Sequence, residues 1–423
     1  MDIGPKIDVS ICPPKAESAT RDVKAYDRPA GAISSTFSTA SAAGFQAEVI
    51  TPHGSPPGLL EQVELTAECR PFDKQEWDTV LAKFDDANLY QSWSYAAARW
   101  GGKNLSHLVL SDGPRVVGAA QVILVKLPLL RGGLAYVKWG PLWRAQNREP
   151  HRHVFQHLLR ALRQEYSHQR GFLLRVVPWE YADVGLQRIP QEEGFHPNPR
   201  FHHRTAVLDL TFSMDELRTS LTKHWRYDLR RAEANHLEII DGTSDSLAGE
   251  FAELYSQMRA LKADAWIPLI PYFHRVQREM PPGMKAHVSI CRYRGEAVAG
   301  LVVSALGDRA FMWLGATGEV GREVRASFLL QWRAIQKLKS QGARIYDLQG
   351  VDEVGHAGTT HFKLGLCGKL GRTVEYVGEF EACEAWPSRL VVGGTDRLRL
   401  PLIRAQQSLQ ALWGAARKRH TVQ

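Results

Sequence analysis

Two stretches of the chain carry the same succession of apolar and polar runs. In each stretch, two apolar runs flank a short polar turn, and a third apolar run, an amphipathic helical pattern and a last apolar run follow. The first stretch places these runs at 107–110, 116–127, 134–139, 151–169 and 172–177. The second stretch places them at 288–293, 297–305, 310–315, 326–340 and 345–348. Two copies in one order predict a duplicated α/β domain.

The length of 423 residues allows two or three domains, each with its own hydrophobic core. We expect a disordered extension at 1–62, because this segment is rich in Ser, Ala, Pro and Gly and has no apolar periodicity. The first α/β domain is expected at 63–205, and the second, with inserted helices, at 206–385. A basic helical tail is expected at 386–423.

Three inserted helices are expected between the two copies, at 214–235, 250–262 and 271–280. Ser213 precedes the first of them and Glu216 follows three residues later, which is the pattern of a capping box.

The first inserted helix has an apolar stripe and a basic face. Its stripe consists of Leu217, Leu221, Trp225 and Leu229. Lys223, Arg226 and Arg230 lie three and four residues apart on a neighbouring face, so their three cations can converge on one anion. The guanidinium group matches the geometry of phosphate. A solvated basic face is the plainer interpretation of the same pattern.

The net charge of +8 favours anionic partners, and most of it lies near the C-terminus. From Trp386 onward there are seven Lys and Arg residues against the single Asp396. An amphipathic stripe follows Pro401, so this segment is expected either to dock on the second domain or to bind an anionic membrane.

The five cysteines are scattered and never form a C-x-x-C pair, which is typical of a reducing compartment. No apolar run reaches the ~18 residues that a membrane span requires, and the N-terminus does not resemble a secretory signal. We therefore expect a cytoplasmic protein. His196, His202 and His203 have no carboxylate at a familiar ligand spacing, so no metal site is expected.

A polar and glycine-rich segment follows the last apolar run of the second copy, between residues 347 and 368. Asp347 lies within that run, and Asp352 lies four residues beyond its end. Loops at the ends of buried strands often hold functional groups, because the sheet fixes their direction. The plainer interpretation is a long connecting loop, although such loops are uncommon in compact domains unless they are functional.

Three motifs in this region resemble the closing motif of the FemAB/FemX family. They are Y-D-L-Q-G-V-D at 346–352, H-F-K-L-G at 361–365 and Y-V-G-E-F-E at 376–381. Members of that family are aminoacyltransferases that build peptidoglycan cross-bridges from aminoacyl-tRNA. They consist of two tandem acetyltransferase-like (GNAT) domains. The resemblance thus implies the same α/β fold for this chain, over about 65–385.

The resemblance also implies roles for individual residues. Arg226, with Lys223 and Arg230 beside it, matches the stretch that holds the diphosphate of a nucleotide-linked precursor. Gln91, Tyr95 and Arg99 resemble the family pattern Q-S-x-x-W-x-x-x-K, with Tyr in place of Trp and Arg in place of Lys. These six residues are the candidate substrate-binding set.

The candidate catalytic set is Lys363, Phe362, Asp347 and Asp352. The resemblance places the pair Phe362–Lys363 beside the acyl acceptor. An ammonium fixed there would stabilise the oxyanion that forms during acyl transfer. Asp347 and Asp352 are candidates for the general base, and acids at strand ends also often serve only to hold a loop.

The expected function is therefore amide formation on an amine of a cell-wall or envelope precursor, linked to a nucleotide or a lipid. Aminoacyl-tRNA is the expected donor, and no resident cofactor is expected. An acyl-CoA-dependent N-acyltransferase is the alternative, although residues 318–325 lack the compact glycine-rich turn that would hold a pyrophosphate. A non-catalytic scaffold belongs to a different class of function, and would transfer an acyl group from neither donor.

Overall fold

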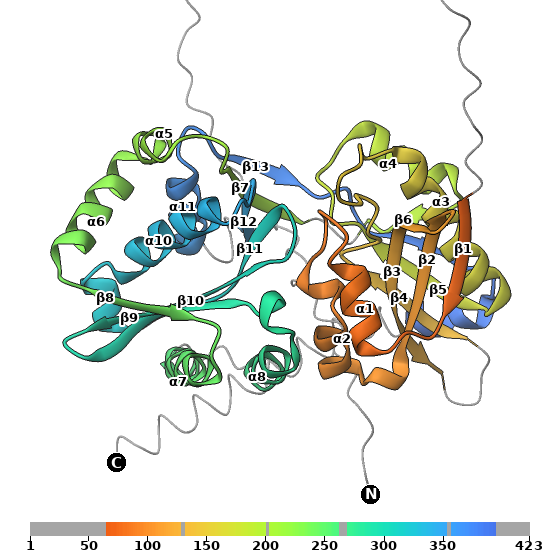
Figure 1. Ribbon diagram of the computed structural model, residues 1–423, viewed down its shortest axis with the longest axis horizontal. Helices are drawn as coiled ribbons and strands as arrows, with labels where there is room; N and C mark the ends of the chain where they lie inside the picture. Colours follow the sequence, from red (N-terminus) through yellow and green to blue (C-terminus); the bar gives the residue numbers. More distant parts are fainter. Residues whose placement is uncertain (1–64, 128–131, 200–202, 262–268, 353–356, 395–423) are drawn as a thin grey trace, which may run out of the picture. The chain divides into compact units, whose positions relative to one another are not determined.

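The computed structural model describes residues 65–127, 132–199, 203–261, 269–352 and 357–394. They form two seven-stranded mixed sheets with helices packed on them, which confirms the α/β class and the duplication (Figure 1). The expected disordered extension and most of the expected basic tail lie outside the described residues, as does the amphipathic stripe after Pro401. Within the described ranges, no helix is both long and apolar enough to cross a membrane.

The first sheet contains both strands of the first predicted hairpin. Its strands, in spatial order, are β1 (Leu65–Arg70), β2 (Leu105–Asp112), β3 (Arg115–Lys126), β4 (Gly133–Lys138), β5 (Phe172–Val177), β14 (Phe380–Ala382) and β6 (His196–Pro197). The helices are α1 (Lys74–Leu81), α2 (Trp93–Trp100), α3 (Arg152–Leu162) and α4 (Val184–Glu192). The helix expected at 151–169 is α3 followed by a π-helical segment, Arg163–Gln169. A Cβ on Gly118 of β3 would lie 2.7 Å from Leu158, so glycine is what lets α3 approach the sheet.

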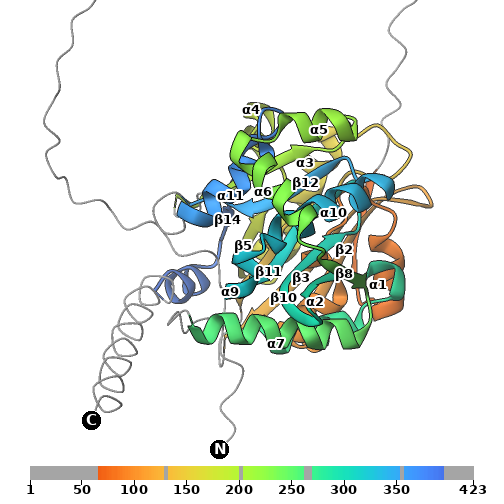
Figure 2. The same ribbon diagram turned by 90° about the vertical axis from the view of Figure 1, so that its left-hand side faces the viewer.

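The second sheet repeats this pattern. Its strands, in spatial order, are β13 (Arg372–Glu375), β7 (Arg204–Asp209), β12 (Ile345–Gly350), β11 (Arg309–Thr317), β10 (Glu296–Ala305), β9 (His287–Tyr293) and β8 (Glu238–Gly242). Its helices are α5 (Met214–Ser220), α6 (Lys223–Ala234), α7 (Asp245–Leu261), α8 (Leu269–Glu279), α9 (Glu319–Glu323), α10 (Ala326–Ser340) and α11 (Ala357–Cys367). In β10, Leu301 and Val303 pack in the cluster that contains α6 and α10, whereas Val302 packs in the cluster that contains α7 and α8 (Figures 1 and 2).

The helix expected at 214–235 is in fact two helices, α5 and α6. The chain is extended at Leu221, and the Thr222 side chain accepts a hydrogen bond from the Trp225 N–H, which starts a new helix. The predicted capping box of Ser213 and Glu216 is present at the start of α5. The apolar stripe continues across the break, and its four residues are buried in one cluster, as predicted. The other two inserted helices are α7 and α8, with slightly different ends from those expected.

The end of the described chain returns to the first sheet. The last two strands belong to different sheets, because β13 pairs with β7 whereas β14 inserts between β5 and β6. The buried guanidinium of Arg175 on β5 forms ion pairs with Glu379 and Glu381. The expected boundary at 385 therefore lies beyond a strand that belongs to the first sheet.

Further contacts near the start of β11 join the two domains. The Asp308 N–H donates to the Asp85 carbonyl over 2.8 Å, and the Arg144 guanidinium binds the Asp308 carboxylate through two hydrogen bonds of 3.1 and 2.9 Å. Arg309 reaches across to donate to the Trp179 carbonyl, with its guanidinium 4.2 Å from the centre of the Tyr181 ring. Backbone and charged side chains thus fix the start of β11 against the first domain.

This junction can be tested at Gly307, where a Cβ would lie 2.0 Å from the Asp85 carbonyl oxygen. We expect Gly307→Ala to lower the free energy of unfolding by about 1–3 kcal/mol, because two backbones would have to move apart. Gly315→Ala on β11 is the matched control, since a Cβ there would meet nothing within 4 Å. Denaturant unfolding of both variants checks the prediction, and equal stabilities would contradict it.

Candidate functional site

The two sheets differ at their parallel strand pair. In the first sheet, β4 and β5 pair at six positions along their whole length, from Gly133↔Phe172 to Lys138↔Val177. In the second sheet, β11 and β12 pair at three positions only, ending at Phe311↔Asp347. Beyond Phe311, β11 has no strand partner on this side among the described residues. Backbone groups at such an opening are available to a ligand.

Asp347 lies where β11 and β12 separate, and its carboxylate is 0% exposed. One oxygen accepts hydrogen bonds from the Thr205 hydroxyl and the Gln349 N–H. The other accepts from the hydroxyls of Tyr181 (3.2 Å) and Tyr376 (2.5 Å). A buried carboxylate needs this number of donors to offset its lost hydration. Its placement favours a positioning role over that of a base in contact with substrate.

Lys363 lies on a helix, α11, and not on the loop that the sequence suggested. Its ammonium, 6% exposed, donates to the carbonyls of Gln349 (3.1 Å) and Gly350 (2.7 Å) at the end of β12. Gln349 has a left-handed conformation (φ 61°), which is uncommon for a residue with a Cβ. The Gln349 N–H donates to the Asp347 carboxylate, and the Gln349 carbonyl accepts from the Lys363 ammonium. Lys363 is therefore fixed at the opening between β11 and β12.

Phe362 connects α11 with the basic helix α6. Its carbonyl accepts a hydrogen bond of 3.1 Å from the Trp225 indole, and its ring packs against the rings of Trp225 and Phe328. A Cβ on Gly365 would lie 2.9 Å from Trp225, so glycine permits the close approach of α11 to α6. The start of the basic helix and the Phe362–Lys363 pair are therefore in direct contact.

The three cations of α6 have different surroundings. Arg226 donates from Nη1 to the carbonyls of Thr219 and Leu221, which closes the end of α5. Its Nε and Nη2 form no hydrogen bond with a described residue. Lys223 and Arg230 are exposed, and Arg230 donates only to the Arg226 carbonyl, over 3.4 Å. The phosphate site on this face stays a prediction from the sequence.

In the first domain, the predicted residues are joined by a lysine that sequence reasoning missed. The hydroxyl of the buried Tyr95 accepts hydrogen bonds from Arg99 (3.1 Å) and from Lys138 at the end of β4 (3.0 Å). The Lys138 ammonium also lies 4.8 Å from the centre of the Tyr90 ring, and no carboxylate of the described residues forms an ion pair with it. Gln91 is buried and donates to the Lys138 carbonyl over 2.8 Å. Gln91 thus fixes the strand end that presents Lys138.

The electrostatics of Tyr95 follow from this arrangement. Burial opposes ionisation of its hydroxyl, but the positive charges of Lys138 and Arg99, which both donate to that hydroxyl, lower its pKa below the usual value. Two cations converging on one phenol form a site that favours negative charge, either as phenolate or as a bound anion.

The remaining candidates are less informative. The backbone N–H of Asp352 donates to the Thr360 hydroxyl, which donates back to the Asp352 carbonyl, so this pair fixes the start of α11.

Within the described ranges, no group of three or more His, Cys, Asp or Glu side chains is placed to hold a metal ion. No local sequence pattern marks Lys138, Tyr181 or Thr205, because the contacts of each residue depend on residues far along the chain.

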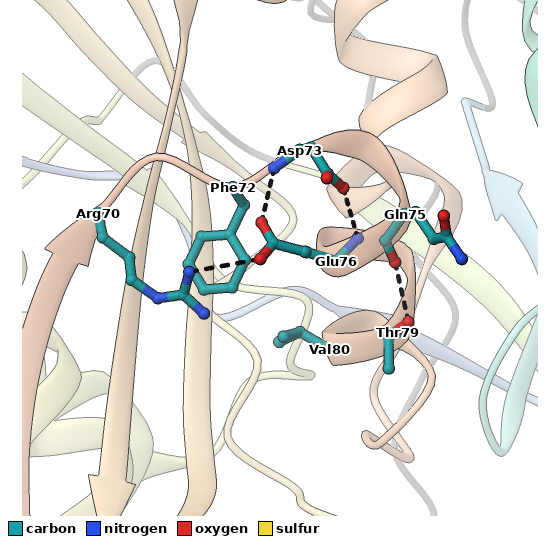
Figure 3. Close-up of a pocket in the computed structure, with 7 residues that line it drawn as sticks. All are labelled: Arg70, Phe72, Asp73, Gln75, Glu76, Thr79 and Val80. Atoms are coloured by element: carbon teal, nitrogen blue, oxygen red, sulfur yellow. Dashed lines mark hydrogen bonds and ion pairs between the residues drawn. The ribbon is translucent and has the colours of Figure 1, made fainter.

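Two surface pockets lie away from these residues, beside α1. The first, of about 350 Å³, is lined by Arg70, Phe72, Asp73, Gln75, Glu76, Thr79 and Val80 (Figure 3). The second, of about 580 Å³, lies between α1 and the segment that follows α8. Neither pocket contains a candidate residue. The capping box of α1, formed by Asp73 and Glu76, explains the polar groups of the first pocket.

The fold of this chain is similar to that of several known proteins. Residues 219–364 match a family model described as an acetyltransferase (GNAT) domain. Among solved structures, FemX superimposes with a TM-score of 0.65 at 15% identity, over 77% of this chain and 99% of that one. A conserved protein of unknown function from Bacteroides thetaiotaomicron VPI-5482 has a TM-score of 0.50 at 11% identity, over 75% and 99%. L-PGS from Bacillus licheniformis has a TM-score of 0.46 at 14% identity, over 75% and 95%.

No curated protein matches the chain. Residues 219–364 thus match a GNAT domain, and the chain has the fold of FemX. The arrangement of two tandem GNAT-like domains is the one that the sequence motifs predicted.

The cluster around Tyr95 predicts an unusual tyrosine titration. In a near-ultraviolet absorbance titration, we expect one tyrosine to ionise below the ordinary range near pH 10, because two cations favour its phenolate. Tyr95→Phe should remove this early component, and Lys138→Met should move it to higher pH. Tyr227→Phe is the control, since that side chain is 56% exposed on α6. An unchanged titration in Tyr95→Phe would refute the assignment.

Proposed function

We propose that this protein is a FemX-like aminoacyltransferase that forms an amide on an amine of a cell-wall or envelope precursor, with aminoacyl-tRNA as the donor. The observation that carries the proposal is the position of Lys363. Its ammonium is held by two carbonyls at the point where β11 and β12 separate. A donor ester lying in that opening would present its carbonyl oxygen to a fixed positive charge.

The reaction follows from this placement. The acceptor amine attacks the carbonyl carbon of the ester, a C–N bond forms, and negative charge develops on the carbonyl oxygen. The Lys363 ammonium stabilises that charge, and collapse of the intermediate breaks the bond to the donor oxygen. Phe362 packs beside this point, and the hydroxyl network of Asp347 keeps the Gln349–Gly350 turn, and with it Lys363, in place.

The cations on both domains support an anionic, phosphate-bearing acceptor. On α6, Lys223 and Arg230 are exposed, and Arg226 has guanidinium nitrogens that no described residue binds. In the first domain, Arg99 and Lys138 converge on Tyr95. Charged groups of this kind suit the phosphates of a nucleotide- or lipid-linked precursor.

The segment between β11 and α10 favours a donor other than acyl-CoA. A pyrophosphate requires an open turn whose N–H groups point at the ligand. Here α9 occupies the segment, and the Gly318 N–H donates to the Val298 carbonyl over 3.0 Å. A Cβ on Gly321 would lie 2.2 Å from the same carbonyl oxygen, so packing against β10 accounts for this glycine. These glycines therefore support the sheet and do not form a phosphate cradle.

Transfer of label from two donors tests the proposal. The purified protein is mixed with an amine-bearing precursor and either labelled aminoacyl-tRNA or labelled acyl-CoA. We expect label to enter the precursor from the charged tRNA. Transfer of label from acyl-CoA alone would show that acyl-CoA, and not aminoacyl-tRNA, is the donor. Transfer from neither donor would indicate that the protein has a non-catalytic role.

Lys363→Met should lower kcat by ~10²–10³, the usual cost of losing one oxyanion donor, with KM little changed. Lys363→Arg should recover only part of the rate, because a planar fork does not occupy the position of an ammonium. Lys369→Met is the matched control, since that lysine is exposed just beyond α11. Unfolding is measured in parallel, because Lys363 also binds two carbonyls. Equal kcat values in folded proteins would refute the role of Lys363.

A further inference from the structure

His203 lies immediately before β7, beside the end of β12. Its ring is partly exposed and contacts the rings of Trp139 and Tyr376, with centroid distances of 5.8 and 5.6 Å. A Cβ on Gly350 would lie 3.8 Å from the imidazole Cε1 and 3.9 Å from Nε2. The Gly350 carbonyl is the group that binds the Lys363 ammonium. The imidazole and Lys363 thus lie at the same strand end.

Three elements direct charged groups toward this imidazole. Lys138 comes from β4, Lys363 from α11 and Asp347 from β12, while the titratable Tyr376 hydroxyl binds Asp347. Burial lowers the pKa of His203 below its usual 6.5, and Lys363 and Lys138 lower it further, against the opposing effect of Asp347. The imidazole is consequently neutral at neutral pH, which is the form that can accept a proton.

We propose that the His203 imidazole is the proton acceptor of this site, an inference that rests on the proposed acyl transfer. As the amine nitrogen bonds to the donor carbonyl carbon, it becomes positively charged and gives a proton to the imidazole. When the intermediate collapses, the imidazolium returns that proton to the departing donor oxygen, which becomes a hydroxyl. Protons and electrons balance without any further reactant.

The neighbouring groups are less suited to this task. Both oxygens of Asp347 already accept two hydrogen bonds each, and the side chain is 0% exposed. Burial raises the pKa of the Cys367 thiol to about 12, which leaves it protonated. His203 combines partial exposure, a neutral ring and a position beside Lys363. Asp347 acts through the Tyr376 hydroxyl as a positioning residue.

The test compares steady-state kinetics of His203→Gln and His203→Ala with the wild-type protein, using labelled aminoacyl-tRNA and an amine-bearing precursor. We expect kcat to fall by ~10²–10⁴, the range for loss of a general base, with KM little changed. Added imidazole should restore part of the rate of His203→Ala, because it can enter the space left by the side chain. Circular dichroism and thermal unfolding confirm that each variant is folded.

His287→Gln and His287→Ala are the matched controls. This histidine is also half-buried in the second domain, and burial and Lys337 lower its pKa, but it lies on β9 and contacts Gln341. We expect these variants to keep the wild-type kcat and to gain nothing from imidazole.

The pH profile gives a second readout. The acidic limb of kcat/KM should lie below pH 6.5 in the wild-type protein, since activity requires the neutral ring and is lost as pH falls through the lowered pKa. Lys138→Met should move this limb to higher pH, because one of the cations that lower the imidazole pKa is removed. A nuclear magnetic resonance titration of the His203 ring should move in the same direction.

Each outcome decides between the claims. Wild-type transfer with unchanged kcat in folded His203 variants would overturn the role of His203 and leave the proposed function intact. A lowered kcat that imidazole does not restore, with an unmoved pH limb in Lys138→Met, would make His203 a packing residue and overturn its role as well. A wild-type protein that transfers from no donor would overturn both.

Discussion

The buried carboxylate of Asp347 is the interaction on which the rest of this structure depends. Its four donors come from β7, from the segment after β5, from the segment after β13 and from its own strand end. Without these donors, nothing would offset the hydration that the carboxylate loses on burial. The four hydrogen bonds to Asp347 therefore hold segments of both domains and the left-handed turn at Gln349 in one arrangement. The carbonyls of Gln349 and Gly350 at that turn accept the hydrogen bonds from Lys363.

The regular parts of the fold followed from local sequence patterns. The helix at 326–340 and both hairpins appear where the apolar periodicity placed them. The helix α11 did not, because Gly358, Gly365 and Gly368 give its segment the composition of a loop. Packing explains two of these glycines, since Cβ atoms at Gly365 and Gly368 would collide with Trp225 and with the Ser220 carbonyl. The break between α5 and α6 was missed because the apolar stripe runs through it.

The site was predictable only where residues lie in contiguous motifs. Lys363 and Phe362 could be named because the H-F-K-L-G run resembles a family motif, and α6 because its cations share one spacing. Lys138 and His203 end or precede strands in ordinary sequence surroundings, and only the tertiary structure brings them together. Asp347 could be named, but its partners Tyr181 and Thr205 are distant in sequence, so its buried and saturated state was not apparent.

The return of β14 to the first sheet has a consequence for how the protein is made. β14 lies between β5 and β6, and β6 pairs with no other strand of the described residues, so the first sheet is incomplete until residue 382 has been synthesised. A ribosome releases the whole second domain before it releases β14. During synthesis, the Arg175 side chain and one edge of β5 therefore remain without their partners until the second domain has left the ribosome. The two domains repeat one architecture, but a chain divided between them would separate β14 from the first sheet. The first domain expressed alone would therefore lack one of its strands.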